Sequence, residues 1–376
     1  MNPIYLDNAA TTPVLPEVTK VIVEAMNTVY GNPSSVHQVG RKARTLIETA
    51  RKNIAKHFQV SAHEILFTSG GSEADNLILH NAVENLGIST IISSKIEHHA
   101  VVKTIEKLQE KYKLKVHWLS VATSGEPDYK ELASLLSADT SKKLVSLMYI
   151  NNEVGTILDV QQVSDLCVEH GALFHSDAVQ AVGHFPIDLS KTPIDFMAAS
   201  AHKFHGPKGV GFAYIKKGYG IKPLLTGGEQ EGGARAGTEN VPAILGMEKA
   251  LEISYEQLDP ERTQIQELKD YFVAELRKNF NGVCINGAED PAKGSYLILN
   301  VRFPKSYAML LFSLDLKGIA ASGGSACQSG SSNGSHVLNE MLNKEEASKT
   351  SIRFSFSKFN TVGEIDQVIA GLKTLL

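Results

Sequence analysis

The sequence predicts an α/β fold, with a large domain built on a mainly parallel sheet flanked by helices and a smaller α+β domain. Two observations lead to this prediction. Helical segments and short apolar segments alternate from about residue 15 to residue 250, which is typical of strands joined by crossover helices. The chain has 376 residues, more than one hydrophobic core usually supports. We therefore expect a large domain over residues 15–250 and a smaller domain made of residues 1–14 and 251–376.

The large domain is expected to alternate helices and strands. Residues 41–57 place six apolar side chains on one helical face, and EILFTSGG at residues 64–71 then predicts a strand that enters a glycine turn. Continuous apolar strands of this kind are typical of parallel sheets. The helical face is formed by Ala43, Leu46, Ile47, Ala50, Ile54 and Ala55. Further strands are expected at residues 91–94, 144–150, 172–178 and 210–215, and further helices at residues 101–112 and 160–170.

The pattern changes from about residue 251, where the smaller domain is expected to continue. A long amphipathic helix is predicted through residues 252–280, followed by the apolar strand YLILNVRF. A polar Gly/Ser stretch at residues 322–335 precedes a C-terminal helix that begins near residue 362. The first dozen residues have no clear partner element, so they are compatible with packing against either domain.

Composition excludes several classes of protein. The net charge is only -4, and lysine and arginine are dispersed among acids, so we expect no nucleic-acid partner. No apolar run reaches the roughly 18 residues that span a bilayer, and the N-terminus lacks the pattern of a signal peptide. We therefore expect a cytoplasmic protein with no membrane segment. The three cysteines, Cys167, Cys284 and Cys327, have no CxxC spacing, which argues against a disulfide framework or a zinc site.

Lys203 is the first candidate for chemistry. It lies in SAHKFHGPKGVG, after a short apolar stretch and before a Gly-Pro turn, where a side chain can face a cleft. A lysine in such a place could form a Schiff base with an aldehyde cofactor that acts as an electron sink. Most lysines are solvated surface charges. The neighbouring motifs therefore have to decide between the two interpretations.

Asp177 closes an apparent buried strand in HSDAVQ. The carboxyl ends of parallel strands are where open α/β sheets bind ligands, so this carboxylate could hold a pyridine nitrogen protonated. Gln180, three residues later, could reach the hydroxyl of the same ring. The alternative is that Asp177 only caps a helix N-terminus.

Two other motifs fit the same kind of cofactor. In FTSGGSEADN the chain leaves a strand, turns on Gly70 and Gly71 and enters a helix at Ser72, which could cradle a phosphate. The alternative is a plain turn between a strand and a helix. EHHAV offers His98 and His99 after a strand; their adjacent spacing favours stacking of one imidazole on a ring over metal binding.

The ordered motifs together resemble the cysteine desulfurases, which are fold-type I pyridoxal 5'-phosphate (PLP) enzymes of the class-V aminotransferase family. The resemblance runs from residue 5 to about residue 360, and the order of ten motifs is much more specific than any one of them. The motifs are YLDNAATT, GNPSSVH, SGGSEADN, EHHAV, NNEVG, SDAVQ, SAHKFHGPKG, RAGTEN, SGGSACQSG and IRFSFS.

The resemblance implies roles for residues around the cofactor ring. Lys203 would hold PLP in Schiff-base linkage, and Asp177 would pair with the pyridinium nitrogen. Gln180 would bond the ring oxygen, and His98 would stack on the ring and take part in proton transfer. Asn152 of NNEVG matches a residue that contacts both cofactor and substrate.

The resemblance also implies a phosphate site and a dimer. The phosphate would be bound by Ser200 and His202, together with Ser72 and the backbone of Gly71. Thr238 of RAGTEN is similar to the family residue that reaches the phosphate of the neighbouring subunit. This implies a homodimer with shared active sites.

The substrate implied is L-cysteine. Arg353 of IRFS would bind the substrate carboxylate through its planar guanidinium, and Asn8 and Ala9 would line the same pocket. Cys327 would take the sulfur as a persulfide and pass it to an acceptor, such as a scaffold protein of iron-sulfur cluster assembly. Its run of small polar residues predicts a mobile, solvated thiol, whereas Cys167 and Cys284 fall in apolar patterns and are expected in the core.

Two departures from the family pattern lie in GGEQEGGARAG. Glu229 stands where a glycine is usual, and Gly232 stands where an arginine is common. We expect this loop near the mouth of the active site and less positive than in the family. Three alternatives stay open: a selenocysteine lyase, a class-V aminotransferase of the same fold, and a catalytically silent scaffold.

Overall fold

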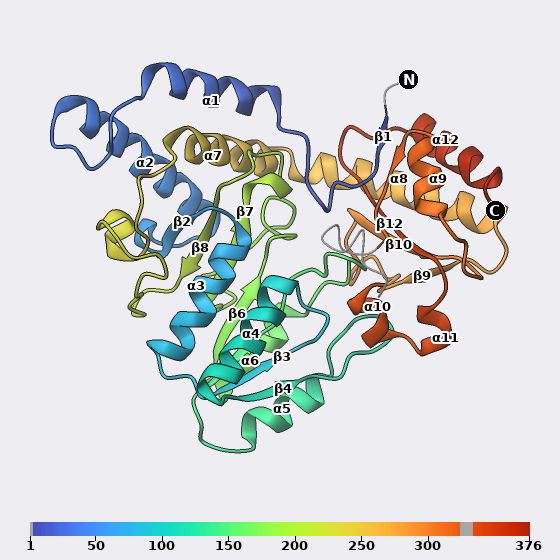
Figure 1. Cartoon of the computed structure of the whole chain (residues 1–376), viewed down its shortest axis with the longest axis horizontal. Helices are drawn as coiled ribbons and strands as arrows, with labels where there is room; N and C mark the ends of the chain where they lie inside the picture. The colour runs from blue at the N-terminus through green and yellow to red at the C-terminus, as the bar shows by residue number, and fades with distance from the viewer. Residues whose placement is uncertain (1–2, 324–333) are drawn as a thin grey trace.

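A computed structural model describes residues 3–323 and 334–376 of the protein. Its larger part is a seven-stranded sheet, and a three-stranded sheet lies to one side (Figure 1). The strands of the larger sheet are β2 (Ile65–Thr68), β3 (Thr90–Ser93), β4 (Lys115–Trp118), β5 (Lys143–Ser146), β6 (Leu173–Asp177), β7 (Phe196–Ser200) and β8 (Gly211–Ile215). Their order across the sheet is β2-β8-β7-β6-β5-β3-β4.

The larger sheet is mainly parallel, as the sequence predicted. Only β8 is reversed: it pairs antiparallel with β2 on one side and with β7 on the other. The connection from β7 to β8, residues 201–210, holds one short 3-10 helix, η2 (Ala201–Lys203), and a Gly-Pro turn. A parallel return needs a crossover of a dozen or more residues, so the chain comes back antiparallel.

Helices cover both faces of this sheet. Successive strand residues point to opposite faces: Phe196 packs in one cluster with α3 and α4, and Met197 packs in another with α2, α5, α6 and α7. No helix in the described ranges has both the length and the apolarity needed to cross a membrane. The helices over this part of the chain are α1 (Pro16–Thr28), α2 (Gln38–His57), α3 (Gly71–Glu84), α4 (His99–Tyr112), α5 (Tyr129–Ser137), α6 (Val160–Glu169) and α7 (Val241–Glu256), with the 3-10 helices η1 (Ala62–Glu64) and η3 (Gln230–Gly233).

The second part of the structure is a three-stranded antiparallel sheet, ordered β12-β10-β9. The ring of Phe272 in α8 meets the rings of Phe354 and Phe356 at centroid distances of 5.0 and 6.2 Å. The domain boundaries at residues 14 and 250 stay predictions. The elements are β9 (Cys284–Asn286), β10 (Ile298–Arg302), β12 (Ser351–Ser355), α8 (Leu258–Asn279), α9 (Leu310–Leu316), α10 (His336–Met341), α11 (Lys344–Ala347) and α12 (Val362–Lys373).

The prediction of one long helix over residues 252–280 is wrong in one respect, because the structure has two helices there. Helix α7 ends at Glu256 and α8 begins at Leu258, with Gln257 at the junction. Pro260 explains the break: it lacks a backbone N–H, and in a continuous helix its ring would clash with the carbonyl of Glu256. Proline is tolerated in the first turn of a helix, which is where α8 places it.

The N-terminal residues contact both parts of the molecule. Strand β1 (Ile4–Tyr5) pairs in parallel with β11 (Ile319–Ala320). The carbonyls of Ala9 and Ala10 accept hydrogen bonds from Lys203, which follows β7 of the larger sheet. This segment therefore links the strand pair at residue 319 to the edge of the larger sheet.

The burial of the cysteine side chains was predicted correctly for Cys167 but not for Cys284. Cys167 is buried in α6, as expected, and its burial raises the thiol pKa. The expectation for Cys284 is wrong, because its side chain is exposed. It begins β9, an edge strand whose first residue faces outward. Cys327 lies outside the described residues.

Candidate active site

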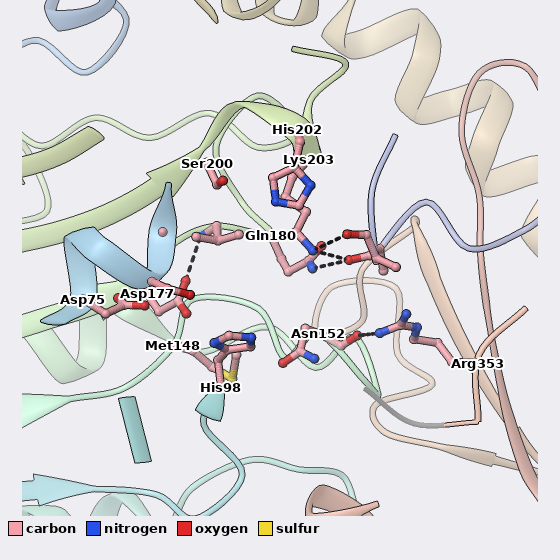
Figure 2. Close-up of a pocket in the computed structure, with 15 residues that line it drawn as sticks. Asp75, His98, Met148, Asn152, Asp177, Gln180, Ser200, His202, Lys203 and Arg353 are labelled. Atoms are coloured by element: carbon pink, nitrogen blue, oxygen red, sulfur yellow. Dashed lines mark hydrogen bonds between the residues drawn. The ribbon is translucent and has the colours of Figure 1, made fainter. Parts of the chain in front are cut away.

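A pocket of about 240 Å³ lies at the carboxyl ends of five parallel strands. The segments that follow β2, β3, β5, β6 and β7 each contribute side chains, as Figure 2 shows. This is the edge where open α/β sheets bind ligands. The lining residues are Ala9, Ala10, Gly71, Ser72, Asp75, His98, Met148, Asn152, Asp177, Val179, Gln180, Ser200, His202, Lys203 and Arg353.

Most residues singled out from the sequence meet in this pocket. Two of the assigned site residues do not: Asn8 is buried beside it, in a smaller adjoining cavity, and Thr238 lines a different pocket. Cys327 lies outside the described residues, so its place is not described. Those that line the pocket are Ala9, Gly71, Ser72, His98, Asn152, Asp177, Gln180, Ser200, His202, Lys203 and Arg353.

Lys203 points into the pocket rather than to the surface. The short helix η2 carries it beyond the end of β7, and its Nζ donates to the carbonyls of Ala9 at 2.6 Å and Ala10 at 3.0 Å. The amide of Gln180 donates to the Ala9 carbonyl as well, at 3.0 Å. The N-terminal segment therefore orients both side chains (Figure 2). A lysine amine held inside a pocket is placed for Schiff-base chemistry.

Asp177 is the last residue of β6 and is buried in the pocket wall. One carboxylate oxygen accepts the Val179 N–H at 3.0 Å. Residues 179–184, which follow directly, form turns and not a regular helix, so the capping alternative does not account for the side chain. Burial raises the Asp177 pKa, while His98 and Lys203 act in the opposite direction. Such a carboxyl favours a cationic partner.

The turn after β2 forms a cradle of backbone N–H groups. Helix α3 begins at Gly71, so its first N–H groups face the pocket with the positive end of the helix. A side chain at Gly71 is excluded, because its Cβ would lie 2.5 Å from the Cγ2 of Val179. The hydroxyl-bearing Ser72 and Ser200 line the same end of the pocket. This donor set fits a phosphate group.

The two adjacent histidines separate in the structure. His98 lines the pocket and caps α4, its Nδ1 accepting the Ala100 N–H at 3.2 Å. His99 instead stacks on His336, with ring centroids 4.2 Å apart. Burial lowers the His98 pKa, and the positive charge of Lys203 lowers it further. A neutral imidazole at this wall is suited to stacking on a ring.

Arg353 and Asn152 form the opposite wall. The Arg353 guanidinium is 1% exposed; it donates to the Asn152 carbonyl at 2.7 Å and to the Asp7 carboxylate at 2.8 Å. Its Nε and the side-chain oxygen of Asn152 have no hydrogen-bond partner among the described residues. Buried polar atoms are seldom left unpaired. They are therefore available to a polar ligand.

Sequence reasoning missed Asp75 and Met148 in the pocket lining. Asp75, His98 and Asp177 each bring a ligand atom within 4.8 Å of the others, so this end of the pocket stabilises positive charge. A signal for Asp75 existed in SGGSEADN. It follows Ser72 by three residues, which places both on one face of a helix.

With the geometry in place, the chain can be compared with known proteins. The family model for class-V aminotransferases matches residues 4–368. The chain belongs to the class-V aminotransferase family. Its relatives include "Cysteine desulfurase IscS" of Dictyoglomus turgidum, 41% identical over 99% of this chain and 94% of the relative. "Putative cysteine desulfurase IscS 1" of Bacillus subtilis is 43% identical over 97% of this chain and 96% of the relative.

Solved structures agree with this assignment. A NifS-like protein matches with a TM-score of 0.91 and 37% identity over 100% of both chains. SspA in complex with cysteine matches with a TM-score of 0.82 and 28% identity, over 95% of this chain and 100% of the other. The predicted fold-type I architecture is confirmed. Class-V aminotransferases as a family depend on PLP.

The loop that departs from the class-V family pattern lies away from the pocket within one chain. The expectation for Glu229 and Gly232 is wrong in this respect: both line a separate pocket of about 280 Å³ that α2 borders. The reason is Glu231 between them. Its carboxylate binds both terminal nitrogens of Arg51, at 2.6 and 2.7 Å, and accepts the Phe67 N–H at 2.9 Å. This contact fastens the loop to α2 and β2.

A buried histidine of this class-V enzyme gives a prediction about acid stability. Burial lowers the His175 pKa to about 3, whereas an unfolded histidine titrates near pH 6.5. The unfolded chain therefore binds the proton first, and His175 lowers the free energy of unfolding as the pH falls below about 6.5, by roughly 2 kcal/mol at pH 5.

His175→Gln removes this contribution. Urea unfolding of the cofactor-free protein at about pH 7 and about pH 5 measures it. We expect the variant to lose ~2 kcal/mol less than the wild type between the two conditions. Equal losses in both proteins would contradict the assignment of a neutral, buried His175.

Proposed function

We propose that this protein is a cysteine desulfurase that binds PLP at Lys203, takes sulfur from L-cysteine and holds it as a persulfide on Cys327. The observation that carries the proposal is the pocket itself, which gathers a lysine amine, a buried carboxyl, an N–H cradle and an arginine around one cavity. The names of the relatives support the reaction. SspA, a structural neighbour, has been solved with cysteine bound.

The residues present fit PLP. Lys203 would hold its aldehyde carbon, Asp177 its ring nitrogen and Gln180 its ring oxygen, while His98 would lie against the ring. The cradle at Gly71, with Ser72, Ser200 and His202, would hold the phosphate. When bound, PLP supplies an electron sink for the negative charge that develops at the α-carbon of an amino acid.

The remaining side chains would bind and position L-cysteine. We assign the substrate carboxylate to Arg353, because its buried guanidinium retains an Nε without a hydrogen-bond partner in the described ranges. Asp7 and the Asn152 carbonyl hold the guanidinium in place. The Lys203 amine lines the same pocket and would be placed to accept the α-proton of the substrate.

Sulfur transfer is assigned to Cys327, which lies outside the described residues. Its thiolate would attack the substrate sulfur, so that an S–S bond forms while the C–S bond of cysteine breaks. The three-carbon remainder takes up one proton at its β-carbon, regains one at its α-carbon and leaves as alanine. The persulfide would then pass to an acceptor protein, such as a scaffold of iron-sulfur cluster assembly.

We further propose a cytoplasmic homodimer with shared active sites. Thr238 is exposed and lines a pocket of about 220 Å³ that is separate from the Lys203 pocket. This position supports the proposal that Thr238 reaches the phosphate of a second subunit. Cytoplasmic placement is supported by three cysteines without a CxxC pair, since disulfide-rich chains belong to oxidising compartments.

The test is turnover of L-cysteine by the PLP-loaded protein, with alanine and Cys327 persulfide measured together. We expect both products, and a loss of about 10²-fold or more in alanine release for Cys327→Ser, because a hydroxyl is a much poorer nucleophile toward sulfur. Cys284→Ser, at the exposed thiol, is the matched control and should keep wild-type turnover.

Two outcomes would overturn the proposal. Full turnover by Cys327→Ser would remove the thiol from the mechanism and favour a lyase that needs no persulfide. Amino transfer to a keto acid, without release of alanine from cysteine, would favour an aminotransferase of the same fold.

A further inference from the structure

A chain of buried polar side chains lies behind Asp177. We infer that Asp75 is a positioning residue for the cofactor: with Asp177 it forms a two-carboxyl site for the protonated ring nitrogen, and His175 and Ser146 hold it there. The inference rests on the proposed function, since it concerns the same PLP site. It adds a residue that the motifs had not singled out for a role at the cofactor.

The contacts that define this chain cross three elements. Asp75 is on α3, and its Oδ1 lies 3.4 Å from the Nε2 of His175 on β6. The Nδ1 of the same imidazole lies 2.9 Å from the hydroxyl of Ser146 on β5. Asp75 is 1% exposed, and His175 and Ser146 are 0% exposed. Solvent therefore cannot satisfy these groups.

Hydrogen-bond accounting orients the chain. His175 is neutral, because burial lowers its pKa to about 3, so one ring nitrogen donates and the other accepts. A Ser146 hydroxyl that donates to Nδ1 leaves the N–H on Nε2, facing Asp75. Asp75 Oδ1 and His175 Nε2 have no hydrogen-bond partner in the described residues, so their 3.4 Å approach is a long electrostatic contact. The pair therefore consists of a donor and a carboxylate acceptor.

The charges around Asp75 explain why a cation belongs beside it. Burial raises the Asp75 pKa, and the nearby carboxyls of Asp177 and Glu97 raise it further. Three buried acids in one place are unfavourable as anions. The basic groups that face them are His98, whose own pKa burial lowers, and Lys203. A positive ring nitrogen would relieve this repulsion.

Asp75 also reaches the cofactor space directly. It lines the pocket together with Asp177, and the two carboxylates lie side by side at one end of the cavity (Figure 2). Their ligand atoms, with that of His98, are within 4.8 Å of one another. At such a distance a second negative charge strengthens the protonation of a ring nitrogen that Asp177 contacts.

The experiment compares the wild type with Asp75→Asn, which keeps the shape and removes the charge. Equilibrium dialysis of the cofactor-free protein against PLP measures affinity, and the chemical shift of an isotope-labelled ring nitrogen measures its protonation across pH. We expect Asp75→Asn to bind PLP about tenfold more weakly. We also expect the pKa of the bound ring nitrogen to be about one unit lower in this variant.

Four further variants separate positioning from structure. His175→Gln should give a smaller change of the same sign, and the double variant should be less than additive, because both act through one chain. Asp75→Glu should restore much of the ring protonation. Asp195→Asn is the matched control, since Asp195 is a buried acid that binds Lys216 outside the pocket; it should leave ring protonation unchanged.

The outcomes distinguish this inference from the proposed function. A wild type that does not bind PLP would overturn the proposed function. Wild-type binding with an unchanged ring-nitrogen titration in Asp75→Asn would overturn the inference alone. A lower melting temperature in Asp75→Asn with an unshifted titration would likewise reduce Asp75 to a structural role.

Discussion

Replacing Lys203 with alanine is expected to lower turnover of L-cysteine by at least ~10³-fold, the range that a positioned proton-transfer group contributes. Among the residues that line the described pocket, Lys203 alone has an amine. Under the proposed function, its loss would remove both the covalent attachment of PLP and the base for the α-proton. Alanine release and the visible absorbance of the protein after dialysis against PLP measure these two effects.

Lys208→Ala is the matched control for this variant. Lys208 is an exposed lysine only five residues further along the chain and does not line the pocket. We expect it to keep wild-type turnover and absorbance. A Lys203→Ala protein that retained more than about a tenth of wild-type turnover would show that another group removes the proton.

Glu231→Ala is expected to lower the free energy of unfolding by about 3–5 kcal/mol, the cost of removing one partner from a buried ion pair. The side chains of Arg51 and Glu231 are 9% and 3% exposed. Arg51 also donates to the Ile65 carbonyl and lies over the ring of Phe67. Without Glu231, the buried guanidinium and the Phe67 N–H would lose a charged partner.

Urea unfolding of Glu231→Ala, with Glu229→Ala as the control, tests this expectation. Glu229→Ala, at an exposed position two residues earlier, should change the free energy of unfolding by no more than about 0.5 kcal/mol. The pair Arg51→Met with Glu231→Leu should recover much of the loss, since the isolated charge is what costs most. Similar midpoints of urea unfolding for Glu231→Ala and Glu229→Ala would contradict a stabilising role for the ion pair.

The sequence was most informative where structure is local. The strands predicted at residues 91–94 and 172–178 are present within one or two residues, because continuous apolar runs mark buried strands. Asp177 was placed correctly for the same reason: it follows such a run directly. The strands β4 and β7 and the helices α1 and α5 went unpredicted, although each is present.

Other features depend on contacts that no linear pattern encodes. The reversal of β8 follows from the length of its connection, and the Asp75–His175 contact joins residues that are 100 positions apart on a helix and a strand. The division between α7 and α8, by contrast, could have been predicted from the sequence. A proline breaks the interior of a helix, and Pro260 lies within the predicted helix. Cys284 was misjudged since an edge strand has one open side.

The order in which the chain is synthesised gives the N-terminal segment a further significance. Asp7 meets Arg353, 346 residues away, and β1 pairs with β11, so neither contact can form until almost the whole chain has left the ribosome. Contacts this distant in sequence slow folding. The larger sheet, whose strands end at Ile215, can assemble earlier, and Ala9 and Ala10 can contact Lys203 as soon as that sheet has formed. Fixing the Arg353 wall of the pocket against Asp7 would then be a late step in maturation, completed on a sheet that has already formed.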